Sequence, residues 1–148
     1  QMLGRIVRDP HGIEGSVREA PGLGLLDIET VMEPEKMVRN VTARSLAFDL
    51  PLAGYEIHVG RTTGPDCARP VAVINNVADG ASSADGKVLG TYLHGFFSAD
   101  AFRAKFLESL GLAVQPENHR ARVERALDAI AAQLEQHLDC DAIFAAAR

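Results

Sequence analysis

The sequence has few cysteines, and their arrangement excludes the two kinds of site that cysteine pairs most often build. Cys67 and Cys140 are the only two, and they lie far apart without a CxxC spacing. This arrangement indicates neither a zinc knuckle nor a redox-active pair, so we expect both thiols to be reduced and unpaired. The five histidines show no HxxxH or HExxH spacing. The sequence therefore predicts no metal site.

Long apolar runs are also missing. No run approaches the roughly 20 residues that a membrane-spanning helix needs. The first residues contain no basic segment followed by an apolar stretch and a small-residue cleavage site, so nothing in them predicts export. We expect a soluble, cytoplasmic protein without a membrane partner.

An excess of positive charge is absent too. The formal net charge is -5, with 15 Lys and Arg against 20 Asp and Glu, and the basic residues are scattered. Because nucleic-acid binding draws most of its affinity from clustered Lys and Arg, this balance predicts no nucleic-acid partner. The sequence contains no phosphate-binding loop either, so we expect no nucleotide or magnesium ion to bind within it.

The residues that are present fit one α/β domain. At 148 residues, 47% of them hydrophobic, the chain can bury about 70% of the surface that its unfolded form exposes. The first six residues are apolar on one side and predict part of a helix. Further along, the pattern predicts a strand over 36–50, a turn at 51–54, a returning strand over 55–60 and another strand over 71–75.

Two helices are predicted in the last third of the chain. The first begins at Ser98, whose side-chain oxygen can cap it, and Gly111 ends it. The second extends from Asn118 to Leu138 and carries one apolar stripe, formed by Val123, Leu127, Ile130 and Leu134. Strands followed by helices, with an antiparallel pair between them, predict an α/β sandwich with a mixed sheet.

His94 is the main candidate for a catalytic residue. Val88, Leu89, Tyr92 and Leu93 predict a buried strand, and His94 follows at its end. Strand ends are where α/β folds usually present catalytic side chains. The alternative is a strand-end histidine that only caps a backbone carbonyl.

Four sequence blocks occur in an order that points to a known family. They are Gln-Met-Leu-Gly at 1–4, Gly-Leu-Gly-Leu-Leu at 22–26, Gly-Tyr-Glu-Ile-His-Val-Gly-Arg-Thr at 54–62 and Gly-Thr-Tyr-Leu-His-Gly-Phe-Phe at 90–97. Together they resemble the cobalamin-type class I glutamine amidotransferase domain of the cobyric acid synthase family. The resemblance implies that residues 1–148 form the C-terminal portion of a flavodoxin-like sandwich with a mixed sheet. It also implies a nucleophile elbow and an ATP-dependent synthetase domain upstream, neither of which the sequence contains.

The resemblance implies roles for two residues. In that family a Gly-Ile-Cys-Gly-Gly-Tyr segment supplies the nucleophilic cysteine, which would stand four residues before Gln1. His94 would be the catalytic base and acid, and Gln1 would contact the amino-acid end of the bound glutamine, with a solvent-facing position as the alternative for Gln1. Because the cysteine is missing, we expect this chain to be inactive on its own as a glutaminase. Neither Cys67 nor Cys140 is expected to replace it.

One position departs from the pattern of related Cys-His-Glu amidotransferases. Where these carry a glutamate two residues after the histidine, this sequence has Phe96. Cobyric acid synthases share this departure, which leaves open what orients the imidazole. Glu56 is a possible substitute, although a structural hydrogen-bonding role is as plausible, and we expect His58 to be a packed strand histidine.

The resemblance also implies the partners. Ammonia released from glutamine would serve the ATP-dependent amidation of adenosylcobyrinic acid a,c-diamide in cobalamin biosynthesis, with the corrinoid substrate, ATP and Mg²⁺ bound by the absent N-terminal domain. No cofactor is expected in this chain, and a homo-oligomer stays open. Two alternatives remain: the glutaminase domain of a cobyrinic acid a,c-diamide synthase, and a non-catalytic, truncated interaction domain.

Overall fold

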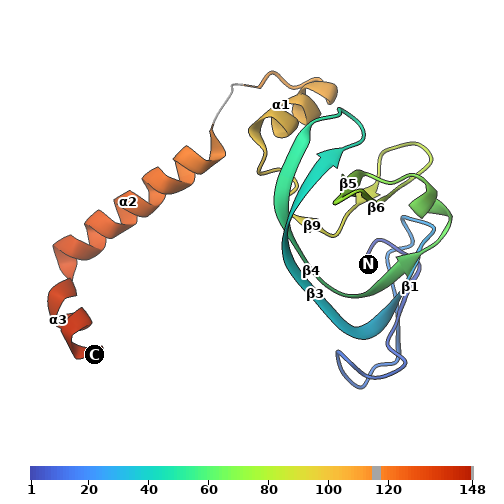
Figure 1. Cartoon of the computed structure of the whole chain (residues 1–148), viewed down its shortest axis with the longest axis horizontal. Coiled ribbons are helices and arrows are strands. Elements are labelled where there is room, and N and C mark those ends of the chain that lie inside the picture. Colours follow the sequence, from blue (N-terminus) through green and yellow to red (C-terminus); the bar gives the residue numbers. More distant parts are fainter. Residues whose placement is uncertain (115–117, 148) are drawn as a thin grey trace.

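The computed structural model describes residues 1–114 and 118–147. A long antiparallel hairpin of β3 (Glu29–Ser45) and β4 (Pro51–Thr63) forms its centre and curves strongly along its length (Figure 1). The curve has a local cause, because the pairing shifts register between Val31 and Lys36. Opposite this bulge, Gly60 has a φ of 102°, and a Cβ there would lie 2.5 Å from the Val31 carbonyl oxygen. Glycine at this position therefore permits the bend.

The other strands extend this hairpin into a mixed sheet, as predicted. The main order is β2 (Glu19–Pro21), β1 (Ile6–Arg8), β3, β4 and β9 (Leu93–His94), while β5 (Ala72–Ile74) pairs with the end of β3 and with β6 (Val77–Asp79). The pairing of β1 with β3 is parallel, and the other pairings of this sheet are antiparallel. A separate two-stranded sheet joins β7 (Ala81–Ser82) to β8 (Leu89–Gly90).

The predicted helix at the beginning of the chain is wrong. Residues 1–5 form turns, and β1 follows directly. The carbonyl of Leu3 accepts hydrogen bonds from the N–H groups of Leu25 and Leu26, both at 2.9 Å, and that of Gly4 accepts one from Gly24 at 2.8 Å. These carbonyls are therefore used by the 22–26 block instead of by a helix. As a result, two of the four family blocks lie side by side.

The hairpin is confirmed, but its turn lies earlier than expected. The chain reverses between Ser45 and Pro51, where Asp49 has a positive φ of 54° and Arg44 donates to the Asp49 backbone oxygen at 2.6 Å. Pro51 is instead the first residue of β4, a position where a strand tolerates proline. Pro51 and Gly54 predict a turn because proline and glycine often mark turns, but both residues lie within β4.

The single strand predicted before His94 is interrupted. β8 and β9 belong to different sheets, and Thr91 lies between them. The Thr91 hydroxyl donates to the Asp79 carboxylate and accepts from the Leu93 N–H at 3.0 Å, while the Tyr92 N–H donates to Asp79 at 3.3 Å. These side-chain hydrogen bonds replace the ladder that would have continued the strand.

The larger core lies between one end of the hairpin and α1 (Asp100–Ser109). Phe102 is 1% exposed, and its ring lies 4.7 Å from that of Phe96 and 5.9 Å from that of Phe48, measured between centroids. The helix begins after Ala99, not at Ser98, and Gly111 (φ 81°) follows its end as predicted. This aromatic packing holds the segment that leaves β9.

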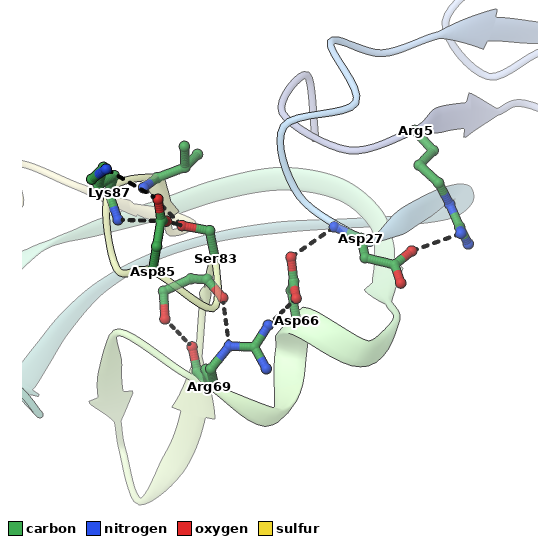
Figure 2. Close-up of polar contacts among 9 residues, drawn as sticks. Arg5, Asp27, Asp66, Arg69, Ser83, Asp85 and Lys87 are labelled. Atoms are coloured by element: carbon green, nitrogen blue, oxygen red, sulfur yellow. Dashed lines mark hydrogen bonds and ion pairs between the residues drawn. The ribbon is translucent and has the colours of Figure 1, made fainter.

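A second, smaller core holds the N-terminal segment against the 3₁₀ helix η1 (Pro65–Ala68). Figure 2 shows the polar contacts that surround it. Asp66 accepts from the Asp27 N–H at 2.7 Å and pairs with Arg69, and Asp27 pairs in turn with Arg5 at 2.6 Å. Arg69 also donates to the Ser82 carbonyl at 3.0 Å. The network fixes the segment that follows Gln1.

The predicted last helix is confirmed as α2 (His119–His137), which α3 (Cys140–Ala146) follows. Asn118 caps α2 by accepting from the Ala121 N–H at 2.8 Å. In Figure 1 both helices extend away from the sheet, and neither has a buried residue among those described. In the part of the chain that the structure describes, no helix is long and apolar enough to cross a membrane.

Candidate functional site

His94 is the last residue of β9, as the sequence analysis predicted, and its side chain is exposed. It lies directly opposite Tyr55 of β4, and the two rings stack with 4.9 Å between centroids and 3° between planes. The imidazole Nε2 lies 3.4 Å from the Ile57 carbonyl oxygen. A solvent-accessible histidine is thus held by one ring face and one backbone carbonyl.

Glycine at position 54 allows this arrangement. A Cβ at Gly54 would lie 1.9 Å from the His94 carbonyl oxygen, far inside van der Waals contact. Any side chain there would push β9 away from β4. The chain also turns sharply after the histidine, because Gly95 has a φ of 82° and its carbonyl accepts from the Ser98 N–H at 2.8 Å.

Gln1 reaches the same strand. Its side-chain Nε2 donates to the Val59 carbonyl at 2.9 Å. β3 occupies one edge of β4 along its whole length, and the carbonyls of residues two apart in a strand point to the same edge. The anchor carbonyls of His94 and Gln1, at Ile57 and Val59, are therefore about 7 Å apart along the other edge. The structure brings the two predicted site residues to one edge of one strand.

A cavity of about 450 Å³ lies on the opposite face of this sheet. Gln1 lines it together with Glu56, His58, Thr62 and Tyr92, and His94 does not. The alternation of side chains explains this separation, because Tyr55 and His94 form one cross-strand pair while Glu56 and Leu93 form the next. The His94 ring therefore lies on the other face of β4 from the cavity that Gln1 lines, so the two predicted site residues share an edge of the strand but not a face.

Neither of the two positions considered for an orienting carboxylate can act on His94. Glu56 points to the cavity face and pairs with Arg39 at 2.6 Å, with its side chain 8% exposed. Of the two roles expected for Glu56, this contact is the structural one. Phe96 is 7% exposed and packs edge-to-face against Phe102. The position that holds a glutamate in related amidotransferases is therefore part of the core in this chain.

A polar chain that begins at buried Thr30 and reaches the cavity at Thr62 and Tyr92 was not predicted from the sequence. The hydroxyls of Thr30 and Thr62 lie 2.6 Å apart, and the Thr62 hydroxyl lies 2.5 Å from that of Tyr92. The Tyr92 ring stacks on His58 with 4.1 Å between centroids, so His58 is a packed strand histidine as expected. His58, Thr62 and Tyr92 belong to the family blocks, and this membership was the only sign in the sequence that they lie together. The β3–β4 register, which places Thr30 directly opposite Thr62, was not visible in the sequence.

The two cysteines are unpaired. Cys67 lies in η1, where burial raises the pKa of its thiol and the Asp66 carboxylate raises it further. A raised pKa keeps a thiol protonated and therefore weakly nucleophilic. Cys140 is the first residue of α3. Across residues 1–114 and 118–147, no group of three or more His, Cys, Asp or Glu side chains is arranged to hold a metal ion.

Comparisons with known proteins identify the family of the chain. The family model of the CobB/CobQ-like glutamine amidotransferase domain matches residues 1–102. The chain is 74% identical to a cobyric acid synthase of Mesorhizobium japonicum over 148 residues, which are 100% of this chain and 30% of the relative. It is 63% identical over 139 residues to one of Rhizobium johnstonii (94% and 28%) and 62% identical over 147 residues to one of Brucella canis (99% and 30%). The chain thus spans less than a third of the length of these relatives.

Proposed function

The chain belongs to the CobB/CobQ-like glutamine amidotransferase family, and we propose that it is the glutaminase part of a cobyric acid synthase. In this proposal His94 is the catalytic base and acid, and Gln1 contacts the substrate glutamine. The nucleophile is a cysteine four residues before Gln1, in a longer polypeptide. Ammonia from the glutamine side chain would then serve the ATP-dependent amidation of a corrinoid carboxylate.

The shared strand edge of Gln1 and His94 is the observation that carries this proposal. Four residues of extended chain span at most about 14 Å. The anchor points of Gln1 and His94 on β4 are about 7 Å apart. A segment that passes around this edge of β4 is therefore long enough to carry a thiol four residues before Gln1 from the cavity face to the exposed imidazole. The segment 1–4 is also held in place by the 22–26 block, which limits where that thiol can lie.

The chemistry needs one group that exchanges protons with sulfur. The thiol gives its proton to the imidazole, and the thiolate attacks the side-chain amide carbon of glutamine to form a carbon–sulfur bond and an oxyanion. As the oxyanion collapses, the carbon–nitrogen bond breaks, the imidazolium returns the proton to the departing nitrogen, and ammonia leaves a thioester. Water attacks the thioester next, with His94 as base, to give glutamate and restore the thiol. Backbone donors for the oxyanion would come from the upstream segment.

The other substrates are assigned to the remainder of the longer protein. This chain has no phosphate-binding loop, and it spans 30% of the Mesorhizobium relative. ATP, Mg²⁺ and the corrinoid would therefore bind to the synthetase part, and no cofactor is assigned to residues 1–148.

The test uses the full-length protein and two nitrogen sources. His94→Ala should abolish amidation with glutamine and leave amidation with added ammonium salt unchanged, because only the first needs the glutaminase. His119→Ala, a change at the first residue of α2, is the matched control and should leave both activities unchanged. Glutamine-dependent activity that survives His94→Ala would refute the proposal. This chain alone, residues 1–148, should release no ammonia from glutamine.

The choice of corrinoid substrate needs a separate measurement. The three relatives described above carry the name cobyric acid synthase, which supports adenosylcobyrinic acid a,c-diamide as the substrate. Amidation of this compound by the purified full-length protein, and none of cobyrinic acid, is the expected result. The reverse result would favour a cobyrinic acid a,c-diamide synthase.

A further inference from the structure

The site raises a question that its family blocks do not answer, namely what holds the His94 imidazole in one orientation and one tautomer. A neutral imidazole carries its proton on either of two nitrogens, and only the unprotonated one can act as a base. Where a carboxylate accepts a hydrogen bond from one ring nitrogen, it fixes this choice. Here Phe96 is packed in the core and Glu56 points to the other face of β4 and pairs with Arg39. The choice must therefore be made by other groups.

The first such group is the Ile57 carbonyl, which lies 3.4 Å from Nε2 of His94. A carbonyl oxygen can only accept a hydrogen bond, so the contact requires the proton on Nε2. The Nδ1 atom of the neutral ring then carries the free lone pair. When the ring becomes an imidazolium, the same carbonyl still accepts from Nε2, and the charge strengthens that hydrogen bond.

The second group is the Tyr55 ring. It stacks on the imidazole with only 3° between planes, and the two residues are direct cross-strand partners. Rotation of the imidazole about its Cβ–Cγ bond would drive its edge into this ring. Stacking therefore keeps the ring plane in the orientation in which Nε2 faces the Ile57 carbonyl. The backbones of β4 and β9 also approach closely at Gly54, which keeps the Tyr55 and His94 side chains next to each other.

We propose that Tyr55 is a positioning residue for His94 and that the Ile57 carbonyl fixes the proton on Nε2, so that Nδ1 exchanges the proton with the catalytic thiol. This inference rests on the proposed function, but it concerns a separate property of the site. It replaces the usual side-chain carboxylate with an aromatic face and a backbone oxygen. A strand-end histidine that caps a backbone carbonyl was the alternative to a catalytic role. In this proposal the contact of His94 with the Ile57 carbonyl serves catalysis, so the two roles are compatible.

The first test is spectroscopic. In the full-length protein labelled with ¹⁵N in its histidine rings, the two nitrogens of a neutral imidazole have well-separated chemical shifts that identify the protonated one. Comparison with His94→Ala assigns the signals. We expect the neutral His94 ring to be protonated on Nε2. A ring protonated on Nδ1, or an even mixture of tautomers, would overturn the assignment.

The second test is kinetic. Tyr55→Leu should lower kcat for glutamine hydrolysis about tenfold to a hundredfold, a part of the 10²–10⁴-fold that a positioned base contributes, with little change in KM. Tyr55→Phe retains the stacked ring and should restore most of the activity. The control is Val17→Ala, at an exposed residue outside β4, β9 and the cavity that Gln1 lines. Unchanged kcat in Tyr55→Leu would overturn the role of Tyr55.

Two readouts keep this inference separate from the proposed function. Tyr55→Leu should also bring the labelled His94 ring to a mixture of tautomers. Amidation with added ammonia should stay intact in the same variant, which would show that the protein has not simply unfolded. If His94→Ala abolishes glutamine use but Tyr55→Leu does not affect it, only the positioning role fails. If His94→Ala retains glutamine use, the proposed function fails, and the tautomer measurement still decides the orientation of the ring.

Discussion

The β3–β4 hairpin and α2 are the two longest elements of the chain, and they keep their apolar residues in opposite places. The hairpin contributes Val41 and Leu52 to a core that α1 closes, and both residues are almost completely buried. The stripe of α2 has the right spacing for a buried face, yet Leu127 and Ile130 are 54% and 57% exposed. The comparison shows that periodicity predicts an element and its apolar face, but does not predict what will cover that face.

The difference also separates two sources of stability. The hairpin is held by long-range pairing and by aromatic packing at one end. The contacts described for α2 include its backbone hydrogen bonds, its N-cap, an ion pair between Arg120 and Glu124, and a hydrogen bond from the His119 N–H to the Asp100 carboxylate. Substitutions in the hairpin should therefore change the free energy of unfolding, whereas substitutions in α2 should mainly change the helicity of α2.

The largest effect is expected in the hairpin core. Phe102→Ala removes a ring that is 1% exposed and contacts Phe48, Phe96 and Phe106. The free energy of unfolding should fall by about 3–5 kcal/mol, measured by urea denaturation. Phe144→Ala in α3 removes a ring that is 68% exposed and should change the same quantity by less than about 0.5 kcal/mol. Equal losses in the two variants would contradict the comparison.

A second effect is expected where the hairpin holds β9. In Gly54→Ala the new methyl group would lie 1.9 Å from the His94 backbone oxygen, so the two strands must separate. We expect a loss of about 1–3 kcal/mol in unfolding free energy and a large loss of glutaminase activity in the full-length protein. In Gly90→Ala the nearest atom is the flexible Leu3 Cδ1 at 3.0 Å, which can move. A variant Gly54→Ala as active as Gly90→Ala would show that β9 does not need this close approach.

The elements with strong local signals were predictable from the sequence. The α2 helix follows from its apolar spacing and the Asn118 cap, and the hairpin follows from two strand patterns around a turn. The errors occurred where long-range contacts override local preference. Residues 1–5 do not form a helix because their carbonyls pair with the 22–26 block, and the strand before His94 is broken by Asp79 and Thr91.

The candidate site was predictable only in part, for a similar reason. The position of His94 at a strand end could be inferred from the apolar residues before it, and the four family blocks identified the family. The stacked Tyr55 and the Ile57 carbonyl could not be inferred, because they depend on the register between β4 and β9. That register is a property of the folded sheet. If β9 shifted by one residue along β4, His94 would no longer lie opposite Tyr55, and the two rings could not stack.

A smaller effect is expected from the helix cap of α2. Asn118→Ala removes the acceptor of the Ala121 N–H, and N-caps of this kind contribute about 1 kcal/mol to their helix. Because none of the described residues of α2 is buried, the loss should appear as lower helicity by circular dichroism, with the urea midpoint of the sheet unchanged. Asn118→Asp retains an acceptor and should restore the helicity. A shifted urea midpoint would show that α2 and the sheet unfold together.

The smallest effect is expected in acid, at the contact between α1 and α2. The His119 backbone N–H and the Arg103 guanidinium both donate to the Asp100 carboxylate, and they lower its pKa below the ordinary 3.8. A carboxyl whose folded-state pKa is lowered stabilises the folded state above its unfolded pKa, and that contribution disappears as the pH falls through the folded value. Asp100→Ala should therefore lower the urea midpoint slightly at neutral pH, and its difference from the wild type should shrink as the pH falls below about 3.8. Asp128→Ala, an exposed residue of α2 outside this contact, controls for the removal of one negative charge. A difference that persists undiminished in acid would show that the Asp100 carboxylate does not stabilise this contact.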